Sequence, residues 1–189
     1  MKNLINLAVL FLLIGITATS CKKDKTNNNP METNMDAILT RTSYFAFDEA
    51  LSKSYEIGFS FSSSKNGKIS KLGLKLPENG TYKVSLWDFD SEQKLDSVFV
   101  TNSDSSKFNY ASITPRSITS GKRYVISVNT NYKNYFCSTG ILVGLFPFTS
   151  GSITFFDQRA ATLNTDNIPN LYVQTSNYCG IAGFVFQAD

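Results

Sequence analysis

Carboxylate side chains gather at one point of the sequence. Asp88, Asp90 and Glu92 stand at alternate positions. Oxygen ligands in this pattern suit a hard cation such as calcium, and a pair of carboxylates is the usual machinery of glycoside hydrolysis. Because acidic residues are also common in turns, a solvated turn is the alternative interpretation.

Histidine is absent from the chain. Its absence excludes Ser/His/Asp and Cys/His catalysis as well as histidine-ligated zinc. A nucleophile at Cys137 or Cys179 would have no imidazole base. We therefore expect a protein that is not an enzyme, and calcium at the acidic cluster is the one cofactor that its residues suggest.

Trp87, the single tryptophan, follows Lys83 and Ser85 on the polar side of an alternating segment. An aromatic ring exposed on a sheet has a flat apolar face and a polar edge, which suits stacking against a sugar. Trp87 is therefore a candidate ligand-binding residue. The alternative is that its ring covers the edge of the core at the end of a strand.

A loop at residues 129–136 alternates amide and aromatic side chains. Amides both donate and accept hydrogen bonds, and tyrosines give flat contact area at a low entropic cost. The candidate contacts for a glycan or a protein in this loop are Asn131, Tyr132, Asn134 and Tyr135. In the alternative, the loop is a polar connection whose last aromatic residues turn inward beside Cys137.

Strands must position these residues, because apolar and polar side chains alternate through most of the chain. No segment of the body shows a sustained helical period. We predict an all-β fold, namely an antiparallel β-sandwich that is jelly-roll-like and has about ten strands. The alternating segments are 55–61, 67–76, 81–87, 94–100, 107–113, 123–130, 140–146, 152–158, 170–175 and 181–187.

Five of these segments, in this order, resemble a known family. They read "YEIGFSF" (55–61), "GKISKLGLKL" (67–76), "GTYKVSLWD" (80–88), "KLDSVFV" (94–100) and "ITPRSITSGKRYVISVNT" (113–130). Together they are similar to the bacterial domain-of-unknown-function family numbered 4082. The resemblance implies a β-sandwich of extracellular proteins, often beside carbohydrate-active modules, with no catalytic residues to carry over. The chain departs from the family at Glu56-Ile57, where the family prefers Leu.

The first 20 residues have the layout of a signal peptide: Lys2, an apolar run over 4–16 and then small residues. The run is shorter than the about 20 apolar residues of a membrane span. Ala18-Thr19-Ser20-Cys21 resembles the lipobox of bacterial lipoproteins, although Ala18 replaces the usual Leu. The resemblance implies that Cys21 carries lipid and anchors the protein to a membrane. An ordinary secretory leader is the alternative.

Residues 21–37 begin with a polar run that has nothing to bury, so we predict a flexible tether there and a single sandwich domain over 38–189. Of 18 basic and 15 acidic residues, 4 and 1 precede Met31, which leaves 14 of each in the body. A neutral body lacks the basic footprint of nucleic-acid binding.

Cys137 and Cys179 are the cysteines that remain beside Cys21. An oxidising compartment favours a disulfide between them. Two buried free thiols are the alternative.

The leading hypothesis is a non-catalytic lipoprotein of the cell envelope, on the outer membrane or cell surface of a Gram-negative bacterium. Its sandwich would display a surface for carbohydrate or another envelope polymer, since loops on a rigid sandwich commonly carry such functions. The alternative is a structural or adhesion component that docks with another envelope protein through sheet edges and aromatic loops.

Overall fold

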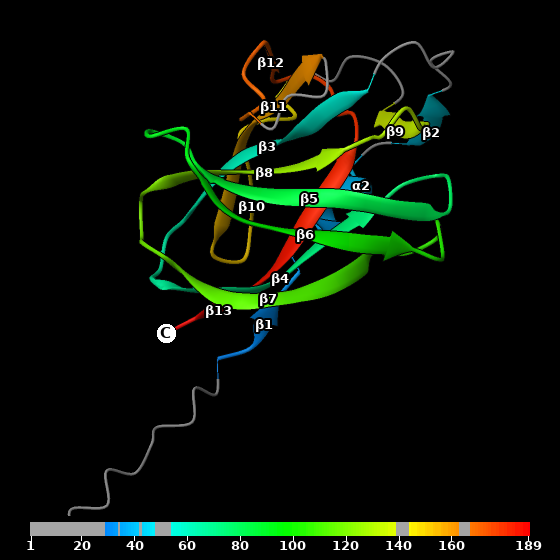
Figure 1. The fold of residues 1–189 in the computed structure, drawn as a ribbon. Helices are drawn as coiled ribbons and strands as arrows, with labels where there is room; N and C mark the ends of the chain where they lie inside the picture. Colours follow the sequence, from blue (N-terminus) through cyan, green and yellow to red (C-terminus); the bar gives the residue numbers. More distant parts are fainter. Residues whose placement is uncertain (1–28, 34, 42, 48–53, 139–143, 163–166) are drawn as a thin grey trace, which may run out of the picture.

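The computed structural model describes residues 29–33, 35–41, 43–47, 54–138, 144–162 and 167–189. These residues form thirteen strands and one helical turn (Figure 1). The elements are β1 (Met31–Glu32), α2 (Asp36–Leu39), β2 (Tyr44–Phe47), β3 (Tyr55–Ser63), β4 (Gly67–Lys75), β5 (Gly80–Asp88), β6 (Lys94–Asn102), β7 (Asn109–Ile118), β8 (Arg123–Asn129), β9 (Tyr135–Ser138), β10 (Phe148–Ser150), β11 (Ile153–Thr162), β12 (Tyr172–Gln174) and β13 (Ile181–Ala188).

Eight of the strands form a jelly roll. One sheet has the order β1-β13-β4-β7, and the larger sheet contains the order β3-β8-β5-β6. Along the chain, the first of these eight strands pairs with the last, the second with the seventh, the third with the sixth and the fourth with the fifth, all antiparallel. This nested pairing is the jelly-roll arrangement, so the predicted antiparallel β-sandwich is confirmed.

The core lies between the two sheets, where the alternation of each strand places its apolar residues. Phe61 of β3 and Phe184 of β13 come from opposite sheets, and their ring centroids are 4.4 Å apart. Both side chains are fully buried. Neighbouring strands add further buried residues to the same core, among them Phe59, Leu72, Leu74, Val84, Leu86, Ile126, Val128 and Phe186.

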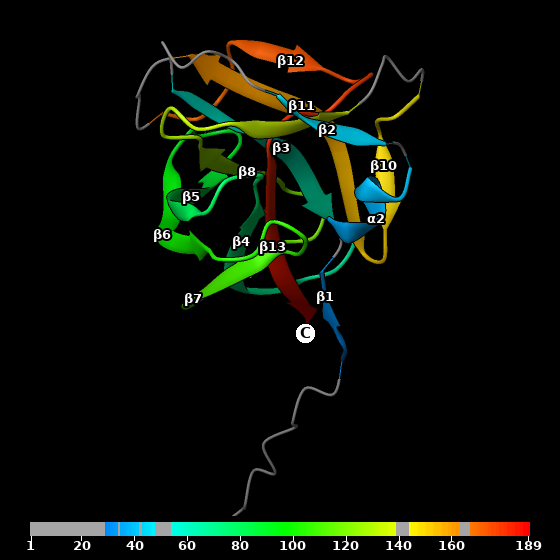
Figure 2. The same ribbon diagram turned by 90° about the vertical axis from the view of Figure 1, so that its right-hand side faces the viewer.

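Additional strands extend the larger sheet beyond β3. β11 pairs with β3 on one side, and on its other side it carries β10 beside its first part and β12 beside its second. β2 and β9 form a separate two-stranded sheet. These additions build one end of the sandwich, where β12, β11 and β9 come together (Figures 1 and 2).

A disulfide joins Cys137 of β9 to Cys179, with 4.1 Å between the two Cα atoms. The predicted pairing is thus confirmed over the alternative of free thiols. Closing a loop across 42 residues stabilises a fold by roughly 4 kcal/mol in the chain-entropy model. The bond ties β9 to the segment that leads into β13.

β1 and the C-terminus lie at the end of the sandwich opposite to β12 (Figures 1 and 2). Asn29 Nδ2 donates to the backbone oxygen of Asp189 at 2.9 Å, and Met31 and Glu32 pair with β13. The sandwich thus begins with β1, ahead of the boundary predicted at residue 38. The signal peptide, Cys21 and the first part of the tether lie outside the described residues.

Most predicted strands coincide with observed ones, with one clear exception. In the segment 140–146, residues 140–143 lie outside the described residues and the following three form no strand. The strands β1, β2, β9 and β10 were not predicted, since two to four residues are too few to show an alternation. The part of the chain that the structure describes has no helix with the length and hydropathy of a membrane span.

Candidate functional site

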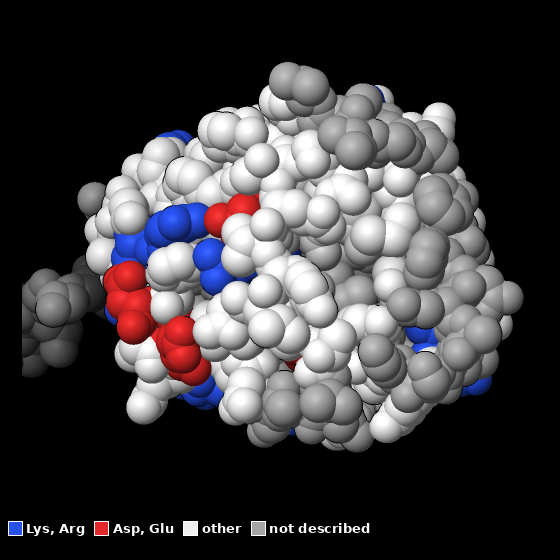
Figure 3. Space-filling model, turned by 90° about the horizontal axis from the view of Figure 1, so that it is seen from above, with Lys and Arg blue, Asp and Glu red and all other residues white. Residues whose placement is uncertain are grey.

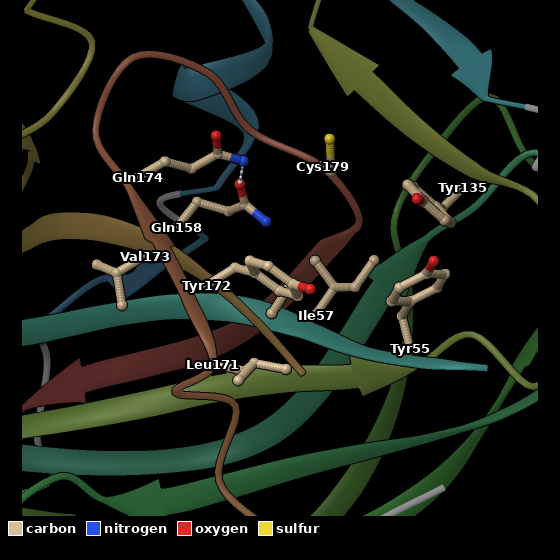
Figure 4. Close-up of a pocket in the computed structure, with 10 residues that line it drawn as sticks. Tyr55, Ile57, Tyr135, Gln158, Leu171, Tyr172, Val173, Gln174 and Cys179 are labelled. Carbon is tan, nitrogen blue, oxygen red and sulfur yellow. Dashed lines mark hydrogen bonds between the residues drawn. The ribbon is translucent and has the colours of Figure 1, made fainter. Parts of the chain in front are cut away.

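A cavity of about 510 Å³ opens at the end of the sandwich that carries β12 (Figure 4). Its size is within the range of small-molecule sites in proteins. β3, β9, β11 and β12 supply most of its lining. The lining residues are Tyr55, Ile57, Tyr135, Gln158, Ala160, Leu171, Tyr172, Val173, Gln174 and Cys179.

A β-bulge decides which polar side chain enters the cavity. The register of β11 against β3 shifts between Phe155 and Asp157. Since one residue of shift moves every following side chain to the other face, Gln158 shares the inner face with its partner Phe59. Asp157 instead points to the outer face, where it bonds to Arg123 and Arg159.

Two amides meet in the cavity. Gln174 of β12 pairs in register with Gln158 of β11, and its side-chain nitrogen donates to the side-chain oxygen of Gln158. Gln158 is only 2% exposed. The NH₂ group of Gln158 takes no part in this bond. Figure 4 shows it pointing toward the space between Ile57 and Tyr172.

Aromatic and aliphatic side chains form the remaining walls. The rings of Tyr55 and Tyr135 meet edge to face with their centroids 5.9 Å apart. Leu171 and Tyr172 make an open rim, with 59% and 56% of their surface exposed. Exposed apolar side chains that cluster around a concavity are typical of binding sites.

The cavity is uncharged along the part of its lining that the structure describes, because none of its ten described residues is Lys, Arg, Asp or Glu. Figure 3 shows the molecule from this end. Charged side chains among the described residues gather toward one side of the view, and uncharged ones cover most of the rest.

Trp87 is buried, so the prediction that its ring is open for a sugar is wrong. It lies on the outer face of the larger sheet, yet it is only 2% exposed. Val125 and Ile168 pack against its ring, and its indole nitrogen donates to Ser127 Oγ at 2.8 Å. The ring is therefore buried, as the alternative held, but in a small cluster on the outer face and not at the edge of the core.

Glu56 lies in the same outer-face network. Ser127 Oγ donates to its carboxylate at 2.5 Å, and the residue is 4% exposed. Burial raises the pKa of Glu56 to about 7, although hydrogen bonds from Ser127 and Asn129 and the charges of two lysines act in the opposite direction. A carboxyl with such a pKa changes its charge near neutral pH.

The acidic cluster forms a turn. Asp88 Oδ1 accepts the backbone N–H groups of Asp90 and Ser91 at 3.2 and 3.1 Å, and its other oxygen pairs with Lys122 Nζ at 2.5 Å. Burial alone would raise the pKa of the Asp88 carboxyl, but the bonds from Lys122 and Ser91 together outweigh it and hold the pKa below its usual value.

The calcium site predicted at Asp88, Asp90 and Glu92 is not formed. Glu92 turns to Asn170, whose Nδ2 donates to it at 3.1 Å. Within the described ranges, no three His, Cys, Asp or Glu side chains are placed to hold a metal ion. The turn interpretation fits these contacts better.

The loop at 129–136 divides in two. Asn131 and Tyr132 have left-handed backbone angles, with φ of 50° and 60°, and Tyr132 is 45% exposed. The backbone N–H of Asn134 donates to Glu78 Oε1 at 3.1 Å, away from the cavity lining. Only Tyr135 reaches the cavity, which is the inward turn considered as an alternative.

Trp87 and this loop do not share a groove. Trp87 pairs with Val125, and Asn131 follows six residues later along the direction of β8. β8 ends at Asn129, and four residues at about 3.3 Å each already place that end roughly 13 Å from Val125. Of the five candidate ligand-binding residues, the structure therefore brings Tyr135 alone to the cavity.

The other important lining residues of the cavity were not among the predicted site residues. Gln158 and Gln174 lie inside the predicted strands 152–158 and 170–175, where nothing in the alternation marks them as site residues. Tyr55 lies in the predicted strand 55–61, and Leu171 and Tyr172 lie in the predicted strand 170–175, with no partner strand assigned to either. Their proximity depends on strand order, which local patterns do not encode.

Comparison with curated proteins gives no match. A family model described as Domain of unknown function (DUF4082) matches residues 43–180. The match includes every described residue that lines the cavity. Since it covers well over half of the sequence, this chain belongs to the DUF4082 family.

Proposed function

We propose that this protein is a non-catalytic binding module of the bacterial cell envelope and that its ligand is a carbohydrate or another envelope polymer. The observation that carries the proposal is the cavity at the β12 end. It combines tyrosine rings with a pair of amides, and this mixture of flat apolar surface and hydrogen-bonding groups suits amphipathic ligands such as sugars.

Binding without catalysis agrees with the chemistry of the lining. The chain has no histidine, and no carboxylate is among the described residues around the cavity. The side chains that most often serve general acid–base catalysis are His, Asp and Glu. The lining that is described offers amides and tyrosine hydroxyls instead.

The direction of the cavity supports an envelope lipoprotein. β1 lies at the end of the sandwich opposite to β12 (Figures 1 and 2), and the chain enters the domain there. A lipid on Cys21, a short distance upstream in sequence, would hold this end toward a membrane. The cavity would then face away from the bilayer, on the outer membrane or cell surface.

A glycan array probed with the whole protein tests the proposal. We expect binding to at least one glycan, with at least a tenfold loss in Tyr172→Ala, because that ring forms the rim. Phe99→Ala is the matched control, since Phe99 is an aromatic residue on β6 with 68% of its surface exposed and no part in the cavity. Equal losses in both variants, or no binding by wild type, would contradict the proposal.

Docking with another envelope protein is the second candidate. β12 is the outermost strand beside the second part of β11, and Leu171, Tyr172 and Val173 are each more than half exposed. An exposed edge with apolar side chains suits strand addition. Recovery of one recurring envelope protein by wild type, and its loss in Val173→Lys, would favour this function if the glycan array is negative.

A further inference from the structure

We propose that the cavity holds an uncharged sugar residue, whose hydroxyl groups pair with the amides of Gln158 and Gln174 while one of its faces lies against Tyr172. This inference rests on the proposed binding function and specifies its ligand class. It distinguishes neutral sugars from acidic sugars, from amino sugars and from wholly apolar ligands.

The amide pair requires a ligand with hydrogen-bonding groups. Gln158 is 2% exposed, and its oxygen is already bonded to Gln174. Its NH₂ group points into the cavity (Figure 4), and the bond to Gln174 uses only its oxygen. A buried donor without a partner is costly, so an apolar ligand that displaced water from this group would bind poorly.

The composition of the lining disfavours an acidic sugar. The described lining has no cation to pair with a carboxylate. Arg159 of β11 forms an ion pair with Asp157 at 2.7 Å on the opposite face of the sheet. A carboxylate that entered the cavity would lose hydration without gaining a charged partner.

An amino sugar is disfavoured for a different reason. Tyrosine faces attract cations, but an ammonium group has only donors. It would place donor against donor at the Gln158 NH₂ group. A hydroxyl group both donates and accepts, so it can accept from the NH₂ of Gln158, which an ammonium group cannot do.

The rim supplies the apolar contact that a sugar also needs. Tyr172 and Leu171 are more than half exposed beside the cavity, and Tyr172 lies on the same side of the sheet as Ala160, with which it pairs. The C–H face of a pyranose stacks against such a ring. One side of the ligand would therefore be polar toward the amides and the other apolar toward the rim.

Titration calorimetry with the whole protein tests this ligand class. The probes are uncharged methyl glycosides, the uronic acids of the same sugars and their amino sugars. We expect one neutral glycoside to bind and its uronic acid and amino sugar to bind at least tenfold more weakly. Gln158→Leu and Gln174→Leu should each weaken the neutral glycoside at least tenfold, whereas Gln93→Leu, at an exposed glutamine outside the cavity, should not.

The outcomes separate the inference from the proposed function. Should a charged sugar bind best and still be lost in Gln174→Leu, the cavity is a sugar site and the neutral-ligand inference is overturned. Should no probe bind, and should Tyr172→Ala leave the glycan array unchanged, both the neutral-ligand inference and the proposed binding function are overturned. Gln174 lies half-buried on β12, so its variant tests the inference even if Gln158→Leu does not fold.

Discussion

At the scale of single residues, the outer face of the larger sheet carries a buried network rather than a bare polar surface. Trp87 donates to Ser127, and Ser127 donates to Glu56. A buried carboxyl is tolerated because the hydrogen bond from the Ser127 hydroxyl replaces part of its hydration. The remaining cost of ionising Glu56 raises its pKa. The stability of this network should therefore depend on pH.

Glu56→Gln should remove a pH dependence of stability. The pKa of Glu56 is about 7 in the folded protein against an ordinary value of 4.5, so the fold binds the proton more tightly than the unfolded chain does. The contribution to the free energy of unfolding is therefore present at low pH and is lost as pH rises from 4.5 through about 7, by roughly 3 kcal/mol. Urea unfolding followed by Trp87 fluorescence should show this fall in wild type and a smaller one in the variant. Parallel pH profiles would contradict the assignment.

At the scale of elements, the close approach of β3 and β8 depends on a glycine. An ideal Cβ at Gly58 would lie 1.9 Å from the backbone oxygen of Ile126 and 2.6 Å from the Cα of Ser127. Both contacts are with backbone, which moves only if the strand pair moves. The residue thus sets the spacing of the two strands that join the inner wall of the cavity to the rest of the larger sheet.

Gly58→Ala should lower the free energy of unfolding by about 3 kcal/mol or more, because overpacking against backbone forces the strands apart. Gly121→Ala is the control. Gly121 has nothing within 4 Å of its ideal Cβ and a φ of +75°, so its variant should lose only about 1 kcal/mol through left-handed backbone strain. Chemical denaturation of both variants measures the difference, and equal losses would refute the steric explanation.

At the scale of the whole molecule, the fold separates its two ends. β1 and the C-terminus occupy one end, and the cavity opens at the other (Figure 1). The disulfide between Cys137 and Cys179 ties the cavity end together. Such a separation suits the proposed function, in which a lipid would hold one end and the other end would bind the ligand.

Cys21→Ser should abolish lipid attachment. Metabolic palmitate labelling should mark wild type and leave the variant unlabelled, and the variant should move from the membrane fraction to the soluble envelope fraction, because a diacylated cysteine supplies most of the membrane affinity. Cys137→Ser, which removes a cysteine of the disulfide, should keep the label. A label that persists in Cys21→Ser would place the lipid elsewhere.

The sequence by itself determined the class of the fold. Alternation in segments such as 55–61 and 181–187 fixes which side chains face a core, because in a strand the choice of face is local and repeats every two residues. The absence of histidine and the pair Cys137 and Cys179 were likewise legible without a structure. These features depend on single residues or on near neighbours.

Only the tertiary structure decided the site. Tyr55 and Gln174 are far apart in sequence and line one cavity because β3, β11 and β12 are neighbours in the sheet. The bulge after Phe155 turns Gln158 inward, against the strict alternation that the sequence suggested. Trp87 is buried because residues distant in sequence cover it. Strand order, register shifts and coverage arise from long-range packing, and a local pattern contains no record of which distant segment will pack against it.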